Sequence, residues 1–347
     1  YSNLFLIKDS WRKSLLWGKP VFALELTIPS VGEELSFYIA VPRRFLEAVI
    51  KIIHGIFPDA HVEETRDYNI FNPDGVSLGS RARFARGKYY PVKTYQKLEG
   101  DPMKALTNVF TQLEKAGEGA ALQIIARPAA KKWKNELTKR AQNLFRGKTG
   151  ESALAHSLHT LGAEQSQEAR AKEERARETK RLTPREEELV RTLEAKAGKS
   201  LFEANIRLLA SAKTKERTEA ILQGLEIAFA QFTDPNTNSF EFERLKKKSL
   251  DTLMFNFSFR NFNEKEFMVL SSEELTSVFH FPNVFLETPY VKRLKAREAS
   301  SPPNLPQEGL LLGYNEFRGK ASDIFMLNED RRRHLYVIGQ TGTGKTT

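Results

Sequence analysis

The chain has 347 residues, with 54 Lys and Arg against 44 Asp and Glu, so its formal net charge at pH 7 is +10. It contains no cysteine, which excludes disulfides, thiolate metal sites and cysteine nucleophiles and is typical of a reducing compartment. The length allows two or three domains. The basic balance favours nucleic acid or an anionic membrane surface as a partner, although a moderate excess of cations can also serve solubility alone.

Residues 1–147 are expected to fold as an accessory domain. Apolar periodicity predicts two strands at 21–29 and 35–41, then a helix from Phe45 to Ile56. Further elements are expected as a strand near 61–68, a loop at 69–80, a strand at 82–95, a helix at 102–116, a strand at 121–126 and a basic helix at 131–146. This order, ββαβ and then βαβα, predicts a ferredoxin-like α+β sandwich, a fold that by itself says little about function.

Residues 148–200 differ in composition and are interpreted as a charged helical linker. Between residues 164 and 180 the chain is mostly Glu, Lys, Arg, Gln and Ala, with no apolar face to bury. Thr183 and Glu186 form the pattern of a capping box that restarts a helix, and Gly198 closes it. Because acids and bases alternate, a solvated helix is favoured over a nucleic-acid-binding one.

Residues 201–281 are expected to form a second α+β region. The patterns predict a strand at 202–209, a helix at 214–232 and a short strand around Phe240 and Phe242. The alternation of Phe255, Phe257 and Phe259 favours a strand over 250–262, with a helix left open. The phenylalanines fall at burial spacing, which favours a core over a base-stacking surface. A capping box at residues 271–274 starts another helix.

Residues 282–308 are punctuated by prolines, carry basic side chains and are interpreted as a linker. A further domain is expected to begin at 309, with strands at 310–314 and 324–327. The apolar run 335–338 then predicts a buried strand that leads directly into a glycine-rich segment. Residues 309–347 therefore have the order expected at the start of a nucleotide-binding α/β domain.

The glycine-rich segment is Gly339-Gln340-Thr341-Gly342-Thr343-Gly344-Lys345-Thr346-Thr347, which matches the phosphate-binding pattern G-x-x-x-x-G-K-[ST]. The glycines let backbone N–H groups turn toward phosphate oxygens. Lys345 is expected to reach the β- and γ-phosphates, and Thr346 to ligate Mg²⁺. The segment therefore predicts ATP and Mg²⁺ as cofactors. The 347-residue chain by itself is expected to be inactive, because the acidic strand end that completes such a site would follow Thr347.

Three stretches carry a resemblance to a known family. Residues 333–346 are similar to the entry into the motor of conjugative-transfer and type IV secretion ATPases of the FtsK–HerA superfamily, nearest to coupling-protein-like members. Residues 309–319 resemble the strand pair that precedes that motor, and residues 269–275 with 279–282 resemble the segment before it. The likeness of residues 1–200 to accessory domains of such proteins is general.

The resemblance implies a hexameric ring with a central pore for DNA, and ATP-driven movement of DNA or of a DNA–protein complex. It also implies a cytoplasmic location at the inner face of the cell membrane, through an upstream anchor, and contact with secretion-channel proteins. Three alternatives stay open. They are a secretion ATPase that moves protein, a repair helicase without an anchor, and a non-catalytic module that docks partners or nucleic acid.

Overall fold

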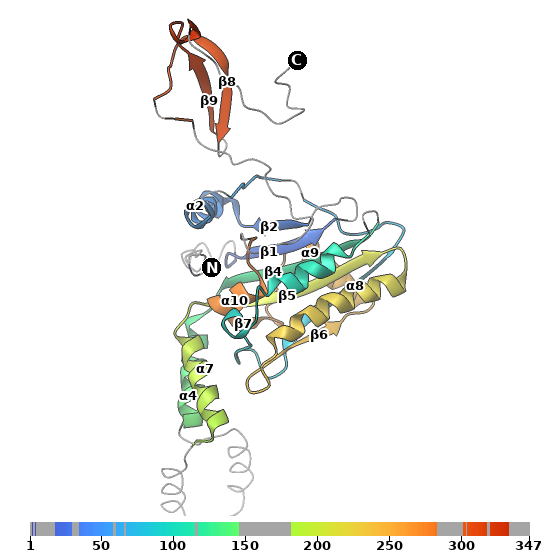
Figure 1. The fold of residues 1–347 in the computed structure, drawn as a ribbon. Coiled ribbons are helices and arrows are strands. Elements are labelled where there is room, and N and C mark those ends of the chain that lie inside the picture. Colours follow the sequence, from blue (N-terminus) through green and yellow to red (C-terminus); the bar gives the residue numbers. More distant parts are fainter. Residues whose placement is uncertain are drawn as a thin grey trace, which may run out of the picture. The chain divides into compact units, whose positions relative to one another are not determined.

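The structure is a computed structural model that describes residues 2, 4, 18–29, 35–57, 60–65, 67–114, 117–145, 182–282, 301–302, 304–317 and 320–332. The chain divides into two compact units. The first combines Tyr1–Val49 with Asp67–Lys292, and the second combines Ile50–Arg66 with Arg293–Thr347. The α+β class expected from the sequence is confirmed (Figure 1).

The first unit is built on a seven-stranded antiparallel sheet with the order β2-β1-β4-β5-β3-β6, in which β7 also pairs with β5. Its strands are β1 (Phe22–Ile28), β2 (Ser36–Ala40), β3 (Val76–Phe84), β4 (Gly119–Pro128), β5 (Leu201–Ala212), β6 (Phe240–Arg244) and β7 (Met268–Ser271). The sheet is centred on β5, which pairs with β4 along one edge and with both β3 and β7 along the other.

One face of this sheet is apolar because large hydrophobic residues alternate along its strands. Leu24, Ile124 and Ile206 lie in one row of cross-strand partners and are all buried. Helix α8 (Lys215–Ala228) continues into the 3-10 turn η4 (Phe229–Phe232), whose Phe229 contacts the rings of Phe240 and Phe242 at 5.4 and 5.0 Å. Helix α3 (Met103–Thr111) packs against α8. The main apolar core therefore lies on this side of the sheet.

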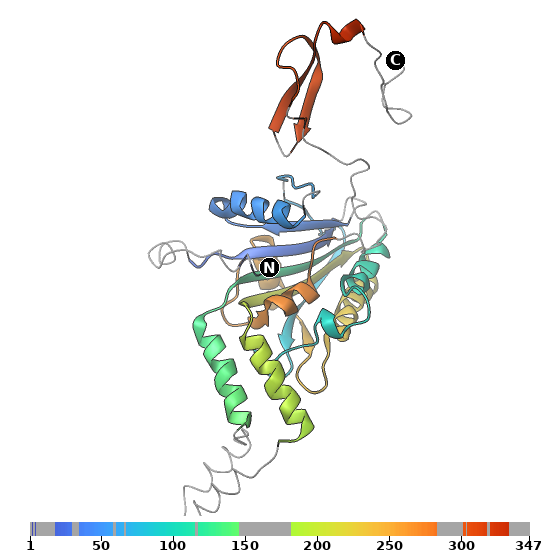
Figure 2. The same ribbon diagram turned by 60° about the vertical axis from the view of Figure 1, so that its left-hand side comes forward.

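Helices α4 (Lys131–Phe145) and α7 (Pro184–Ala197) follow β4 and precede β5 (Figures 1 and 2). They pack side by side through a cluster that includes Leu137, Ala141 and Leu193. The predicted capping box of Thr183 and Glu186 begins α7 and is confirmed, as is its end at Gly198. Residues 184–200 consequently belong to the folded unit, which corrects the predicted extent of the linker at 148–200; residues 146–181 lie outside the described residues.

The predicted domain boundary between residues 1–147 and 201–281 is wrong. Strand β4 of the first region pairs with β5 of the second over ten residue pairs, from Gly119↔Ser211 to Pro128↔Phe202. Strand β3 of the first region lies between β5 and β6 of the second. Neither region has a sheet of its own. The sequence pattern identified strands but could not reveal that pairing partners lie so far apart along the chain.

Three further predictions are corrected. Residues 61–65 and 67–68 form no strand, and β3 begins at Val76 and ends at Phe84 rather than covering 82–95. Residues 248–258 form a helix, α9 (Lys248–Ser258), and not the favoured strand. Its buried residues, Leu253 and Phe257, are four positions apart, which is a helical spacing. The remaining predicted elements agree with the structure within a few residues, including α2 (Leu46–Ile56) and α10 (Ser272–Val278) with its capping box at Ser271 and Glu274.

The second unit contains a two-stranded antiparallel sheet of β8 (Leu310–Phe317) and β9 (Lys320–Met326), followed by the 3-10 turn η5 (Asp330–Arg332). These strands agree with the predictions at 310–314 and 324–327. No helix in the described parts of the chain has the length and apolar character needed to cross a membrane.

Candidate functional site

The predicted phosphate-binding loop, Gly339–Thr347, and the expected strand before it lie outside the described residues. The last described residue is Arg332, at the end of η5. The assignments of Lys345 to phosphate and Thr346 to Mg²⁺ therefore stay predictions. Within the described structure, many of the buried polar and charged side chains gather on the second face of the sheet.

This second face carries a row of polar side chains that crosses six strands. Register places one residue from each strand opposite the next, and the row runs Tyr38, Glu25, Gln123, Arg207, Arg81, Glu243. Directly opposed residues on neighbouring strands lie on the same face and interact. Within the row, hydrogen bonds join Glu25 to Gln123, Gln123 to Arg207, and Arg81 to Glu243.

Glu25 is fully buried near one end of this row. Its carboxylate accepts hydrogen bonds from Gln123 Nε2 at 2.8 Å, from the Tyr68 hydroxyl at 3.0 Å and from Arg260 Nε and Nη2 at 2.9 and 3.0 Å. Burial and the nearby Glu25 charge raise the pKa of Tyr68. Hydrogen bonding to Arg260 lowers the pKa of Asp67. The buried charge of Glu25 is compensated by one arginine and two neutral donors.

Arg207 lies at the centre of the row and is 3% exposed. Within the described structure its guanidinium contacts no carboxylate, and its partners are neutral oxygens: Gln123 Oε1 at 2.8 Å, the Asn256 carbonyl at 2.9 Å and the Asn261 carbonyl. Burial lowers the pKa of Arg207 to about 10, which leaves it protonated at neutral pH. A cation beside the last carbonyls of α9 interacts favourably with the helix dipole.

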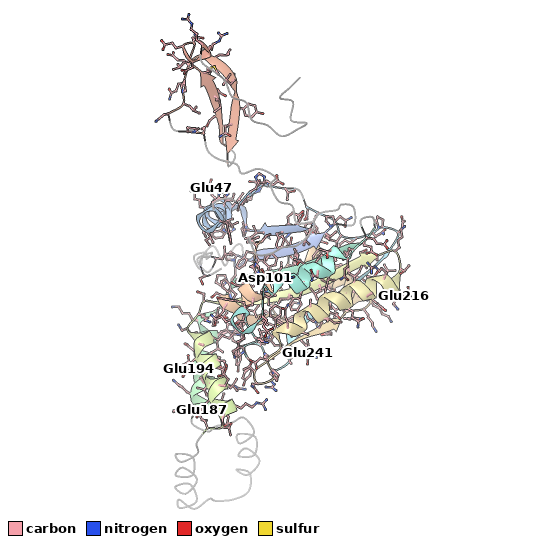
Figure 3. The ribbon with its side chains drawn as sticks, in the orientation of Figure 1. Glu47, Asp101, Glu187, Glu194, Glu216 and Glu241 are labelled. Atoms are coloured by element: carbon pink, nitrogen blue, oxygen red, sulfur yellow. The ribbon has the colours of Figure 1, made fainter. Side chains whose placement is uncertain are left out.

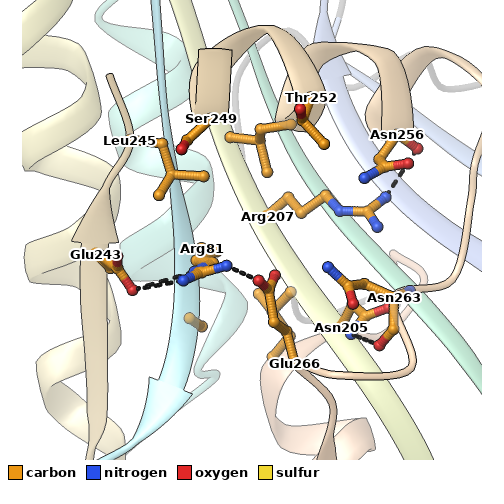
Figure 4. A pocket seen from close by; sticks show the side chains of 13 residues that line it. Arg81, Asn205, Arg207, Glu243, Leu245, Ser249, Thr252, Asn256, Asn263 and Glu266 are labelled. Carbon is orange, nitrogen blue, oxygen red and sulfur yellow. Dashed lines mark hydrogen bonds and ion pairs between the residues drawn. The ribbon is translucent and has the colours of Figure 1, made fainter. Parts of the chain in front are cut away.

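A polar pocket of about 180 Å³ opens above an interruption in the sheet (Figure 4). The β3 ladder on β5 ends at Arg207, and the β7 ladder begins at Ala204. Beside this interruption the side-chain amide of Asn205 binds the backbone of the segment that lies between β3 and β7 along this edge of β5. It donates to the Asn263 carbonyl at 3.1 Å and accepts from the Asn263 N–H at 2.7 Å. The pocket is therefore the junction where β3, β5, α9 and the segment before β7 meet.

The polar groups around the pocket are largely paired with one another. Arg81 donates to Glu243 at 2.9 Å and also pairs with Glu266 (Figure 4). Ser249 and Thr252 are the hydroxyl groups of the lining, and the Thr252 hydroxyl donates to the Lys248 carbonyl at 2.8 Å. In the described ranges no cluster of His, Cys, Asp and Glu could hold a metal ion. The mutual pairing of the polar groups is what a structural junction between the elements requires.

Comparison with known proteins identifies the region that carries this sheet. A family model described as "Domain of unknown function (DUF8128)" matches residues 20–293. The chain belongs to this DUF8128 family. No curated protein and no solved structure matches it. The matched region contains β1 to β7 and ends before β8, β9 and the predicted phosphate-binding loop.

A second buried charge cluster of the DUF8128 region lies where β4 leads into α4. Arg127 and Glu203 face each other at 2.7 Å, with 5% and 4% of their side chains exposed. Trp133 Nε1 donates to Glu203 at 2.7 Å, and Glu264 binds the other side of the Arg127 guanidinium. This hydrogen bonding lowers the pKa of Glu264. The cluster ties the start of α4 to the segment before β7.

A third cluster of the DUF8128 region joins α7 to α10. Lys196 Nζ lies 2.8 Å from Glu274 Oε2, and both side chains are almost completely buried. Burial lowers the pKa of Lys196, and Glu274 opposes that change. Glu274 also accepts from the N–H groups of Val92 and Ser271, so one carboxylate holds a helix cap, a loop and a second helix together.

Sequence reasoning missed these residues, although β5 carried a signal for them. Glu203, Asn205 and Arg207 alternate with Ala204 and Ile206, and such alternation normally marks a solvent-exposed face. Here all twelve residues of β5 are buried. This alternation in β5, together with the polar segment 259–267 later in the chain, could have suggested that the segment covers a polar face of the sheet.

Proposed function

We propose that this chain is the N-terminal part of an ATP-driven DNA translocase of the type IV secretion class, and that ATP–Mg²⁺ binds at residues 339–347. The observation that carries the proposal is the G-x-x-x-x-G-K-[ST] pattern directly after an apolar run. Strands β8 and β9 support it, since a strand pair precedes the loop as the family resemblance implies.

The loop chemistry follows from its residue types. Backbone N–H groups of Gly342, Gly344, Lys345 and Thr346 bind phosphate oxygens, since a turn of this kind points successive amides inward. The Lys345 ammonium neutralises charge that develops on the γ-phosphoryl group, and the Thr346 hydroxyl ligates Mg²⁺. A P-loop ATPase core that begins at about residue 309 is part of this proposal.

The DUF8128 region serves in this proposal as a non-catalytic accessory body. Its charged side chains at the sheet are used in mutual pairing, as for Arg127 with Glu203 and Arg81 with Glu243. In the whole protein this body belongs with a hexameric motor at the inner face of the membrane, where channel proteins are its partners. ATP hydrolysis is coupled to movement of DNA by the motor.

The test measures ATP hydrolysis by the full-length protein with and without DNA. Lys345→Ala is expected to lower the turnover number by about a hundredfold or more, because the transition-state charge loses its cation. Lys246→Ala, an exposed lysine outside the motor, is the matched control and keeps full turnover. Unchanged hydrolysis in Lys345→Ala refutes the proposal. Hydrolysis that needs Lys345 but ignores DNA assigns the motor to protein cargo.

A further inference from the structure

A group of cations lies on the outer side of α4 and on the loop after β3. It consists of five exposed residues, which we call the cationic patch: Lys88, Lys131, Lys132, Lys139, Arg140. On α4 the buried residues Leu137 and Ala141 face the neighbouring α7. The side opposite them presents lysines together with the amides of Asn135 and Gln142, at intervals of three and four residues.

Part of the patch, namely Lys88, Lys132 and Arg140, lies over a group of aromatic rings. Tyr89 stacks on Tyr90 at 5.5 Å and contacts Trp133 at 6.2 Å. Trp133 in turn meets Phe267 edge-on at 5.7 Å. These contacts fix the loop after β3 against the first turn of α4, so Lys88 of the loop and Lys132 of α4 lie over rings that contact each other.

Three of the patch cations are positioned over these rings. Lys88 Nζ lies 4.7 Å from the centre of the Phe267 ring, and Lys132 Nζ lies 5.0 Å from that of Trp133. Arg140 lies 5.6 Å from the Tyr90 ring, and its Nε donates to the Tyr90 hydroxyl at 2.8 Å. The rings hold the positive charges in place without neutralising them.

The charge of the patch is not balanced by its surroundings. In the part of the chain that the structure describes, no carboxylate forms an ion pair with a patch residue, and no ion pair joins α4 to α7. The only acid on α4 is Glu136. The acids of α7, among them Glu187 and Glu194 (Figure 3), lie on the neighbouring helix. The patch is therefore a local surplus of positive charge.

We propose that the cationic patch binds the phosphate backbone of double-stranded DNA. Charge complementarity favours a polyanion, and lysines mixed with amides are typical of phosphate contacts. Base stacking is disfavoured because cations lie over the rings. A lipid surface is disfavoured because α4 exposes a single large apolar side chain, Phe145 at its last residue, which is too little for insertion. The inference deepens the proposed function by naming where DNA meets the chain.

The test measures the affinity of the full chain for a short labelled duplex of mixed sequence, without ATP, by fluorescence anisotropy between about 50 and 200 mM KCl. The variant is Lys131→Gln, Lys132→Gln and Lys139→Gln combined. It is expected to reduce the steepness of the salt dependence by about three units and to weaken binding at least about tenfold at low salt. Equal affinity for several duplex sequences is also expected.

The matched control combines Lys104→Gln, Lys246→Gln and Lys248→Gln, three exposed lysines elsewhere, and keeps the parental salt dependence. Circular dichroism checks that both variants fold. Equal losses in both variants, or no loss in the patch variant, overturn the proposal. The proposal is also overturned if the patch variant binds duplex normally and loses binding only to vesicles that contain about one-third phosphatidylserine. The patch would then be a lipid-binding surface. Lys345→Ala is expected to bind duplex normally, so failure here is distinguishable from failure of the ATPase proposal.

Discussion

The two faces of the seven-stranded sheet come from the same strands but hold their neighbours by different forces. One face presents buried side chains such as Leu24, Ile124 and Ile206 to the apolar core, and α8 covers the part of it over β5 and β3. The other presents Glu25, Arg207 and their row to α9, and hydrogen bonds and ion pairs prevail there beside a small apolar cluster that includes Leu209 and Phe257. Apolar burial supplies stability without direction, whereas hydrogen bonds supply direction at a cost in desolvation.

The difference explains how an irregular segment is kept in one conformation. Between α9 and β7, side chains of the sheet hold successive positions of the chain. Arg207 holds the Asn261 carbonyl, Arg127 lies 4.0 Å from the centre of the Phe262 ring, and Asn205 holds both backbone groups of Asn263. A segment with so few buried apolar residues gains its position from these directional contacts. One sheet thus builds the main core on one face and fixes a loop on the other.

The largest expected effect comes from the apolar face. Phe22 is completely buried and meets Phe202 edge-on at 5.8 Å. Phe22→Ala is expected to lower the free energy of unfolding by about 3–5 kcal/mol, because it removes a ring and leaves a cavity. Equilibrium urea unfolding measures it. Ile227→Ala, which truncates an α8 residue with 63% of its surface exposed, serves as control and stays within about 0.5 kcal/mol.

A substitution in the polar face is expected to lower the free energy of unfolding by less, and to loosen the segment that the polar face holds. Arg207→Met should lower the free energy of unfolding by about 2–4 kcal/mol, because the buried Gln123 Oε1 and two part-buried carbonyls lose this donor. Hydrogen exchange in residues 256–263 should become faster than in Phe22→Ala. Arg83→Met, which removes an exposed arginine paired with Glu241, is the control. Parental exchange rates in that segment would contradict a positioning role for Arg207.

The smallest effect concerns an isolated ion pair at the start of α8. Glu118 accepts from Arg217 at 2.7 and 2.8 Å, and this hydrogen bonding lowers the pKa of Glu118 below 4.5. A lowered carboxyl pKa gives stability above the unfolded-state pKa that is lost as pH falls through the folded-state value. Glu118→Gln should therefore cost about 1 kcal/mol at pH 7, and progressively less below about pH 4.5.

Urea unfolding at several pH values measures this pH dependence. Glu216→Gln, an exposed neighbour in the first turn of α8 (Figure 3), is the control and should show no such trend. A Glu118→Gln deficit that persists unchanged at pH 3 to 4 would contradict the role of the ionised carboxylate.

Sequence patterns predicted the structure correctly where it depends only on residues close together in the chain. Thr183 and Glu186 cap α7, and Ser271 and Glu274 cap α10, because a capping box uses only groups within four residues. The strand alternation of β1 was likewise readable. Residues 250–262 misled because Phe255 and Phe259 are exposed and only Phe257 of the three is buried, so the alternation did not report burial.

The candidate site residues likewise fall into a group that could be predicted from the sequence and a group that could not. The phosphate-binding pattern at Gly339–Thr347 is contiguous, so it could be recognised from sequence and stays a prediction. The polar row combines residues from six strands between Glu25 and Glu243, and no local pattern relates them. A one-residue change of strand register would move each of them to the opposite face.

By itself, the sequence determined the positions of most helices and strands, the capped helix ends and the phosphate-binding pattern, since each depends on neighbouring residues. Only the tertiary structure decided that β4 pairs with β5 in a single sheet, that α9 is helical, and that Arg207 is buried among neutral oxygens. The physical reason is that pairing register and the burial of charge are set by residues distant in the chain, whose contacts exist only once the sheet has formed.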